Sequence, residues 1–132
     1  MTTITIELPI PHRLLHKNGR TRAYLYRAMI VRNARRLSQV LASSTLAEAK
    51  AEPPRWKRAT LHAAWYFKPS KRGAKLREHD DDGLVSWIVP YRDGLQDAGI
   101  IANDSGLTHL PHTVAIDAKH PRVVLTVEAK QC

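Results

Sequence analysis

The sequence predicts an α/β fold of the α+β kind, in which a small mixed sheet is packed by two main helices. Stretches of alternating apolar and polar residues, typical of strands, take turns with stretches whose apolar residues recur every three or four positions, typical of helices. The order is strand, helix, strand, helix, strand, strand. A chain of 132 residues has room for one compact domain, and we assign residues 1–132 to it.

The first half of the chain supplies the first strand, the longer helix and the second strand. Residues 2–8 alternate and stop at Pro9, which cannot donate to a sheet. A helix should begin near Thr21 and end before Pro53-Pro54. Residues 59–67 alternate again and predict the second strand. The buried stripe of the helix should consist of Tyr26, Ile30, Ala34, Leu37 and Leu41.

The second half supplies the shorter helix and the last two strands. Asp81 or Asp82 is a suitable N-cap for this helix and Gly99 a suitable C-cap, while Pro90 predicts either a kink or two short helices. Residues 114–118 and 123–127 alternate and predict two strands joined by a turn. The apolar stripe of the helix should consist of Leu84, Ile88, Tyr91, Leu95 and Ala98.

The distribution of charge points to an acidic partner. The formal net charge is +9 and the sequence pI is about 10.1, which favours nucleic acid first and an anionic membrane surface second. Every charged residue in 13–36 and in 55–77 is positive, and the arginines of the longer helix have no acid nearby in the sequence to pair with. A solvated helix surface is the alternative for these arginines, but because no acid is placed to pair with them we expect them to contact a polyanion.

Other features of the sequence narrow the class of protein. No apolar stretch approaches the ~20 residues that span a membrane, and the first ten residues lack the pattern of a secretion signal. Cys132 is the only cysteine, which argues against an internal disulfide and against metal binding through thiolates. We therefore expect a cytoplasmic protein.

Seven of the twelve acidic residues lie between Glu78 and Asp104, which predicts a bound divalent cation. In an extended segment Asp80 and Asp82 project to the same side, and Asp104 follows the next helix. Ligands that are all oxygen favour Mg²⁺ or Mn²⁺. The alternative is a solvated turn beside a helix N-terminus. His109 and His112 form a second candidate metal pair, but no third ligand has an obvious spacing.

Four short motifs resemble those of the RusA family of Holliday-junction resolvases, which are common in phages and prophages. The motifs are Asp80-Asp81-Asp82-Gly83-Leu84, Arg92-Asp93-Gly94-Leu95, Ala98-Gly99-Ile100-Ile101 and Asn103-Asp104. The resemblance implies a homodimeric crossover junction endodeoxyribonuclease that uses Mg²⁺, with Mn²⁺ as a substitute, to nick four-way DNA junctions. It implies that Asp80, Asp82 and Asp104 bind the metal.

The chain departs from the family at a lysine that is thought to assist at the phosphate, whose counterpart here is Val89. Arg92 is the only cation between Asp82 and Asp104, so it is a candidate replacement, as is a lysine of residues 68–75. The missing lysine favours one alternative, a protein that binds junction or duplex DNA with weak or no nuclease activity. A third possibility is an enzyme of the same fold that cuts flaps.

Two further sets of residues complete the expectations. The aromatic residues Trp65, Trp87 and Tyr91 are expected in the core, with a dimer interface as the alternative. The residues expected to bind DNA phosphates are Arg20, Arg22, Arg32, Arg35, Arg36, Lys71, Arg72 and Lys75.

Overall fold

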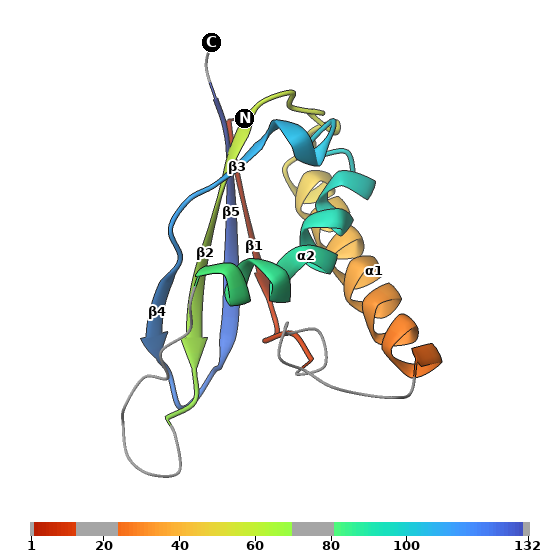
Figure 1. Cartoon of the computed structure of the whole chain (residues 1–132). Helices are drawn as coiled ribbons and strands as arrows, with labels where there is room; N and C mark the ends of the chain where they lie inside the picture. Colours follow the sequence, from red (N-terminus) through yellow and green to blue (C-terminus); the bar gives the residue numbers. More distant parts are fainter. Residues whose placement is uncertain (1, 13–23, 70–80, 131–132) are drawn as a thin grey trace.

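Five strands form one mixed sheet, and both helices pack on the same face of it (Figure 1). The computed structural model describes residues 2–12, 24–69 and 81–130, and for residues 24 and 81–83 it describes the backbone alone. The elements in chain order are β1 (Thr3–Leu8), α1 (Tyr24–Glu48), β2 (Ala59–Phe67), α2 (Asp81–Asp97), the 3-10 helix η2 (Asp104–Gly106), β3 (Leu107–His109), β4 (Thr113–Ile116) and β5 (Arg122–Ala129).

The sheet is built around β5 and β2, which pair antiparallel along most of their length. β1 pairs antiparallel with the other side of β5, while β3 and β4 both pair in parallel with β2, near its start and its end. The alternation expected for these strands is seen in their burial, because Ile6, Leu61 and Leu125 face the helices and are almost fully buried. The expectation of a mixed sheet with two helices is confirmed.

The sequence prediction missed η2 and β3. Each is three residues long, so neither contains enough positions to show a period. The break between β3 and β4 falls at residues 110–112, where Pro111 cannot donate to the neighbouring strand. These short elements matter because they carry Asp104 and His109.

The buried stripe of α1 agrees with the prediction in part. Ile30 is buried and Ala34 and Leu41 pack against the core as predicted, but Tyr26 and Leu37 are exposed, and the stripe includes Ser38, Ala42 and Leu46 instead. The contact therefore follows a four-residue ridge of the helix, as in close packing between two helices. The helix ends at Glu48, where Lys50 takes a positive φ of 52°.

α2 is one continuous helix that contains Pro90, so the prediction of two short helices is wrong. Figure 1 shows it changing direction near its middle. The helix already includes Asp81, which places Asp81 and Asp82 in its first turn rather than at the N-cap. The predicted stripe from Leu84 to Ala98 is confirmed as buried. Gly99 ends the helix with φ of 82°, as expected for a C-cap glycine.

The two helices approach closely at Gly94. A Cβ atom there would lie 2.3 Å from the backbone oxygen of Arg35 and 2.7 Å from the Cβ of Ser38. The buried Ser38 hydroxyl donates a hydrogen bond of 2.7 Å to the backbone oxygen of Tyr91. Only a glycine allows this contact, so the position of α2 along α1 depends on residue 94.

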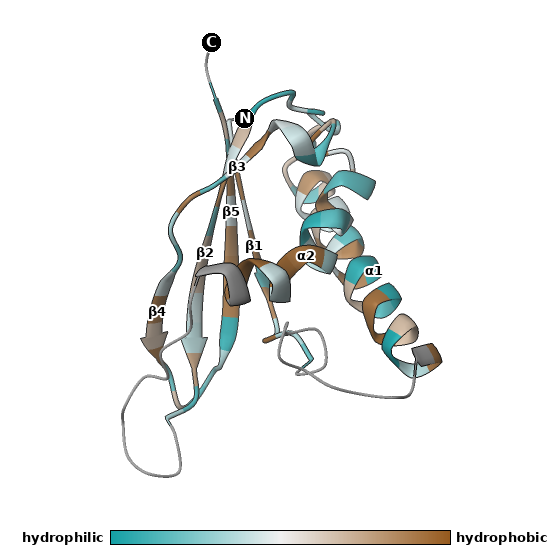
Figure 2. Ribbon diagram, in the orientation of Figure 1, coloured by the Kyte–Doolittle hydropathy of each residue, from teal (hydrophilic) through white to brown (hydrophobic). Residues whose placement is uncertain are grey.

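Side chains of α2 also form hydrogen bonds with the segment that follows β1. The Tyr91 hydroxyl donates to the backbone oxygen of Pro9 at 2.8 Å, and the Trp87 Nε1–H donates to that of His12 at 2.9 Å. Burial raises the pKa of Tyr91 to about 12, so its hydroxyl stays protonated as a donor. Trp65, Trp87 and Tyr91 all lie in the core, which confirms the first of the two expectations for them. Figure 2 shows the apolar residues of the sheet beneath the helices.

We predict that Gly94→Ala lowers the free energy of unfolding, because the added methyl group overpacks the contact with α1 at a cost of roughly 1–3 kcal/mol. This loss should outweigh the gain of about 1 kcal/mol from the higher helix propensity of alanine. Urea denaturation measures the difference. Ser44→Ala, at an exposed position of α1, is the control and should change stability by no more than about 0.5 kcal/mol. A Gly94→Ala variant as stable as the parent chain would refute the close contact.

Candidate active site

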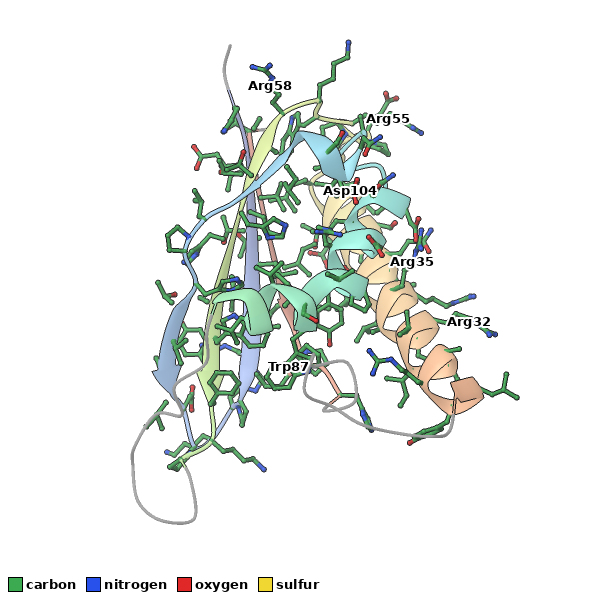
Figure 3. All side chains as sticks on the ribbon, in the orientation of Figure 1. Arg32, Arg35, Arg55, Arg58, Trp87 and Asp104 are labelled. Carbon is green, nitrogen blue, oxygen red and sulfur yellow. The ribbon has the colours of Figure 1, made fainter. Side chains whose placement is uncertain are left out.

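Asp104 presents a carboxylate at the surface beside the C-terminal half of α2. It begins η2, which is capped by the Asn103 side chain accepting a hydrogen bond of 3.1 Å from the Ser105 N–H. The Asp104 side chain is 45% exposed, so a ligand can reach its oxygens. Figure 3 shows Asp104 next to the last turns of α2.

Arg92 is the cation that this carboxylate faces. Its Nη2 lies 3.5 Å from the Asp104 Oδ2, and its Nη1 donates a hydrogen bond of 3.3 Å to the Nε2 of His109. Its Nε is buried and has no hydrogen-bond acceptor among the described residues, although the Asp93 carboxylate lies 3.9 Å away. Arg92, Asp104 and His109, which we call the Arg92 cluster, thus join α2, η2 and β3.

The surroundings of His109 favour its neutral form. Burial lowers the pKa of His109, and the positive charge of Arg92 and the proximity of His112 lower it further. Because arginine is always protonated, the Nε2 of His109 must be the acceptor in their hydrogen bond. His112 has a different partner, since its Nδ1 accepts a hydrogen bond of 2.8 Å from the Trp65 Nε1–H. His109 therefore pairs with Arg92 of α2, whereas His112 pairs with Trp65 of β2.

The other predicted metal ligands are placed only in part. Asp80 lies outside the described residues, and Asp82 is described by its backbone alone, in the first turn of α2. Arg92 follows Asp82 by ten residues, which span about 15 Å along an α-helix. Convergence of Asp80, Asp82 and Asp104 on one ion thus depends on the placement of the chain before α2 and stays a prediction. Within residues 2–12, 24–69 and 81–130, no three His, Cys, Asp or Glu side chains are grouped for metal binding.

Oxygen donors of the kind that Mg²⁺ prefers are nevertheless present. The Asp104 carboxylate is accessible, and its one ion pair within the described residues is the 3.5 Å contact with Arg92, so it can turn toward a cation. It is the one member of the predicted ligand set whose side chain is described.

The arginines of α1 fall into two groups. The Arg35 Nε and Nη2 donate hydrogen bonds of 2.5 and 2.7 Å to the Asp97 carboxylate of α2. This ion pair lowers the pKa of Asp97, chiefly through the hydrogen bond from Arg35. The expectation that no acid pairs with these arginines is therefore wrong for Arg35. Arg32 and Arg36 are exposed and pair with no carboxylate among the described residues (Figure 3 shows Arg32).

The acidic cluster is also compensated in part from within the chain. Arg92 lies beside Asp93 and Asp104, and Arg35 pairs with Asp97. The expectation that compensation comes from bound cations is therefore wrong for Asp97, and it stays a prediction for Asp104 and for the acids at positions 78 and 80–82.

A second group of cations lies next to η2, and the sequence did not single it out. Arg55, Lys57 and Arg58 are exposed in the segment that enters β2. The Arg55 backbone N–H donates to the backbone oxygen of Gly99. A Cβ atom built at Gly106 would lie 1.9 Å from the backbone oxygen of Lys57, so the two segments are in close contact. The segment therefore runs along residues 99–106, and Figure 3 shows Arg55 and Arg58 toward the same end of the molecule as Asp104. The only signal in the sequence was membership of the basic stretch 55–77.

The remaining predicted DNA contacts cannot be placed. Neither the residues before α1 nor those between β2 and α2 are described, which leaves out Arg20, Arg22, Lys71, Arg72 and Lys75.

Comparison with models of known protein families and with curated proteins gives no match to either. No helix in the described part of the chain has the length and apolar character to cross a lipid bilayer.

We predict that Arg92→Gln raises the pKa of His109 toward its ordinary value of 6.5, because the variant removes a positive charge next to the ring. The rise should be incomplete, since burial lowers the pKa independently. Following the ring proton shifts by NMR against pH measures the change. Arg35→Gln, which removes a cation that has a different partner, should leave the titration of His109 unchanged. Equal titration curves in the parent chain and in Arg92→Gln would contradict the contact.

Proposed function

We propose that the protein is a Mg²⁺-dependent, structure-specific endodeoxyribonuclease that resolves four-way DNA junctions by paired nicks. The proposal is supported above all by the exposed Asp104 carboxylate, which lies 3.5 Å from Arg92, and by the exposed cations Arg55, Lys57 and Arg58 in the segment that runs along residues 99–106. An accessible carboxylate on a strongly basic chain suits an enzyme that holds a metal ion against a DNA phosphate. The choice of four-way DNA junctions as the substrate rests on the motifs that resemble those of the RusA family.

In this proposal Asp80, Asp82 and Asp104 hold Mg²⁺ or, in its place, Mn²⁺. The bound ion supplies Lewis acidity and a water molecule of lowered pKa. Arg92 is the residue of α2 that can reach the same phosphate, in place of the family lysine that is absent at Val89. The exposed arginines of α1 and the cations of 55–58 bind the DNA backbone without reading its sequence. The protein acts in the cytoplasm as a homodimer, whose paired sites match the two-fold symmetry of a junction.

The second candidate function is binding of junction or duplex DNA with weak or no cleavage. One observation favours it: the Asp104 carboxylate already faces a cation of its own chain, so a metal ion must compete with Arg92. A binding protein would use the same basic residues. The two functions differ only in whether the phosphodiester is cut when Mg²⁺ is added.

We predict that Asp82→Asn binds a synthetic four-way junction about as tightly as the parent chain but nicks it at least ~100-fold more slowly, because the loss of a metal ligand should exceed the roughly 10- to 100-fold cost of losing a residue that supports one. Asp81→Asn is the matched control, since it removes the neighbouring carboxylate, which is not assigned to the metal. It should cleave at close to the parental rate. Gel assays with labelled junction measure both variants.

The same assay separates the candidate functions. Labelled junction, duplex and flap substrates are incubated with and without Mg²⁺. Cleavage of the junction alone supports the resolvase, cleavage of flaps supports an enzyme of different specificity, and binding without cleavage supports the second function. Normal cleavage by Asp82→Asn would refute the site assignment.

We predict that binding weakens steeply with salt and that Arg32→Gln lowers the slope of log K against log [salt] by about 0.9, as expected for the loss of one contact to a duplex phosphate. Arg32 is chosen because it is exposed and pairs with no carboxylate of the described residues. Lys119→Gln, an exposed cation outside the assigned DNA-binding set, is the control and should leave the slope unchanged. Fluorescence anisotropy at several salt concentrations gives the slopes. A flat salt response would remove the basic surface from the proposal.

A further inference from the structure

Large apolar side chains that remain exposed are concentrated on one helix. Six such side chains are exposed in the described part of the chain, and five of them belong to α1. Their exposed fractions are 81% for Leu25, 46% for Tyr26, 44% for Met29, 37% for Leu37 and 50% for Val40, against 39% for Leu110 outside the helix. Scattered single residues of this kind are ordinary, but a cluster on one element marks a contact surface.

The five side chains share one side of α1. At 100° per residue they fall within an arc of about 120°, on the opposite side from the buried stripe that includes Ser38 and Ala42. Figure 2 accordingly shows apolar segments along α1 as well as beneath it. The exposed positions Met29, Asn33, Arg36, Val40, Ser43 and Ala47 follow steps of four and three residues, the spacing of a seam between two helices. We call this set the α1 seam. Met29 and Val40 of the exposed apolar side chains belong to it, Leu25 lies in line with Ser43, and Tyr26 and Leu37 border it on one side.

The α1 seam is complementary to itself when one copy is reversed. Its N-terminal half carries the bulkier Met29, Asn33 and Arg36, and its C-terminal half ends in the small residues Ser43 and Ala47. In an antiparallel pair that is centred on residue 38, Met29 lies opposite Ala47 of the second helix and Asn33 lies opposite Ser43. Met29 and Asn33 thus meet small side chains, as close packing requires, and Arg36 lies opposite Val40, which can pack along the aliphatic part of the arginine.

The charges of α1 favour the same orientation. Its arginines, at positions 27, 32, 35 and 36, lie in the first half, and its only acid, Glu48, is the last residue. A parallel pair would place arginine against arginine, whereas an antiparallel pair moves the basic half of each helix toward Glu48 of the other. The aromatic residues Trp65, Trp87 and Tyr91, the other candidates for an interface, are buried in the core.

We propose that the α1 seam is the surface by which two copies of this chain associate, with their α1 helices antiparallel. The proposal identifies the interface of the expected homodimer, and it holds whether or not the protein cleaves DNA. It also removes Arg36 from the DNA-binding set, because the partner helix covers that side chain. Arg32, at the border of the seam, stays accessible.

The mass of the protein in solution tests the proposal. Sedimentation equilibrium without DNA or metal should give twice the chain mass of 14.9 kDa. Met29→Glu combined with Val40→Glu should weaken the dimer at least about 100-fold, tenfold or more for each charge placed in an apolar contact. Leu110→Glu is the matched control, with similar exposure outside α1, and should leave the dimer intact. Circular dichroism checks that each variant keeps its helices.

Cysteine pairs test the orientation without burying a charge. In a Cys132→Ser background, Met29→Cys protein mixed with Ala47→Cys protein should form a disulfide between chains, while Met29→Cys alone should not. A monomer, a dimer that survives the two glutamates, a dimer that Leu110→Glu breaks equally, or a disulfide of Met29→Cys with itself would each overturn the proposal. None of these results depends on nuclease activity, so failure of the seam and failure of the proposed function are distinguishable.

Discussion

The close approach of α2 to α1 at Gly94 is the contact on which the arrangement of the other elements depends. Without a side chain at residue 94, the backbone oxygen of Arg35 and the Ser38 hydroxyl can lie against α2. The same close packing brings Arg35 to Asp97. It also positions α2 so that Tyr91 and Trp87 can donate hydrogen bonds to the segment that follows β1. A single glycine therefore couples helix packing to the position of the candidate site.

Arg92 links that packing to the chemistry. It lies between Pro90 and Gly94 on α2, and it contacts residues of η2 and β3. A partly buried guanidinium needs anionic or accepting partners, and Asp104 and His109 provide them. In the proposed function two of these groups take on new partners: Asp104 turns toward the metal ion, and Arg92 turns toward the phosphate. Under this proposal the Asp104 carboxylate would exchange the guanidinium of Arg92 for the metal ion as its cationic partner.

The basic residues at the surface of the molecule differ in their neighbours. Arg35 is held by Asp97, Arg36 lies among the residues of the α1 seam, and Arg55, Lys57 and Arg58 lie beside η2. A high net charge alone gives all of them the same expected role. Their neighbours assign them different ones: a helix-to-helix ion pair, a place in the proposed dimer contact and a place beside the candidate site.

The sequence alone determined the features that repeat over short distances. Alternation located β1 and β2, and the three- and four-residue spacing located α2 and its buried side, because these periods follow from local backbone geometry. Only the tertiary structure decided which face of α1 is buried, that Asp97 pairs with Arg35, and that Arg92 joins Asp104 to His109. α1 has apolar residues on both sides of the predicted stripe, so its period does not fix which of them lie deepest. The contact at Gly94, a residue far along the chain, turns the helix so that Ser38 and Ala42 are buried while Tyr26 and Leu37 are exposed.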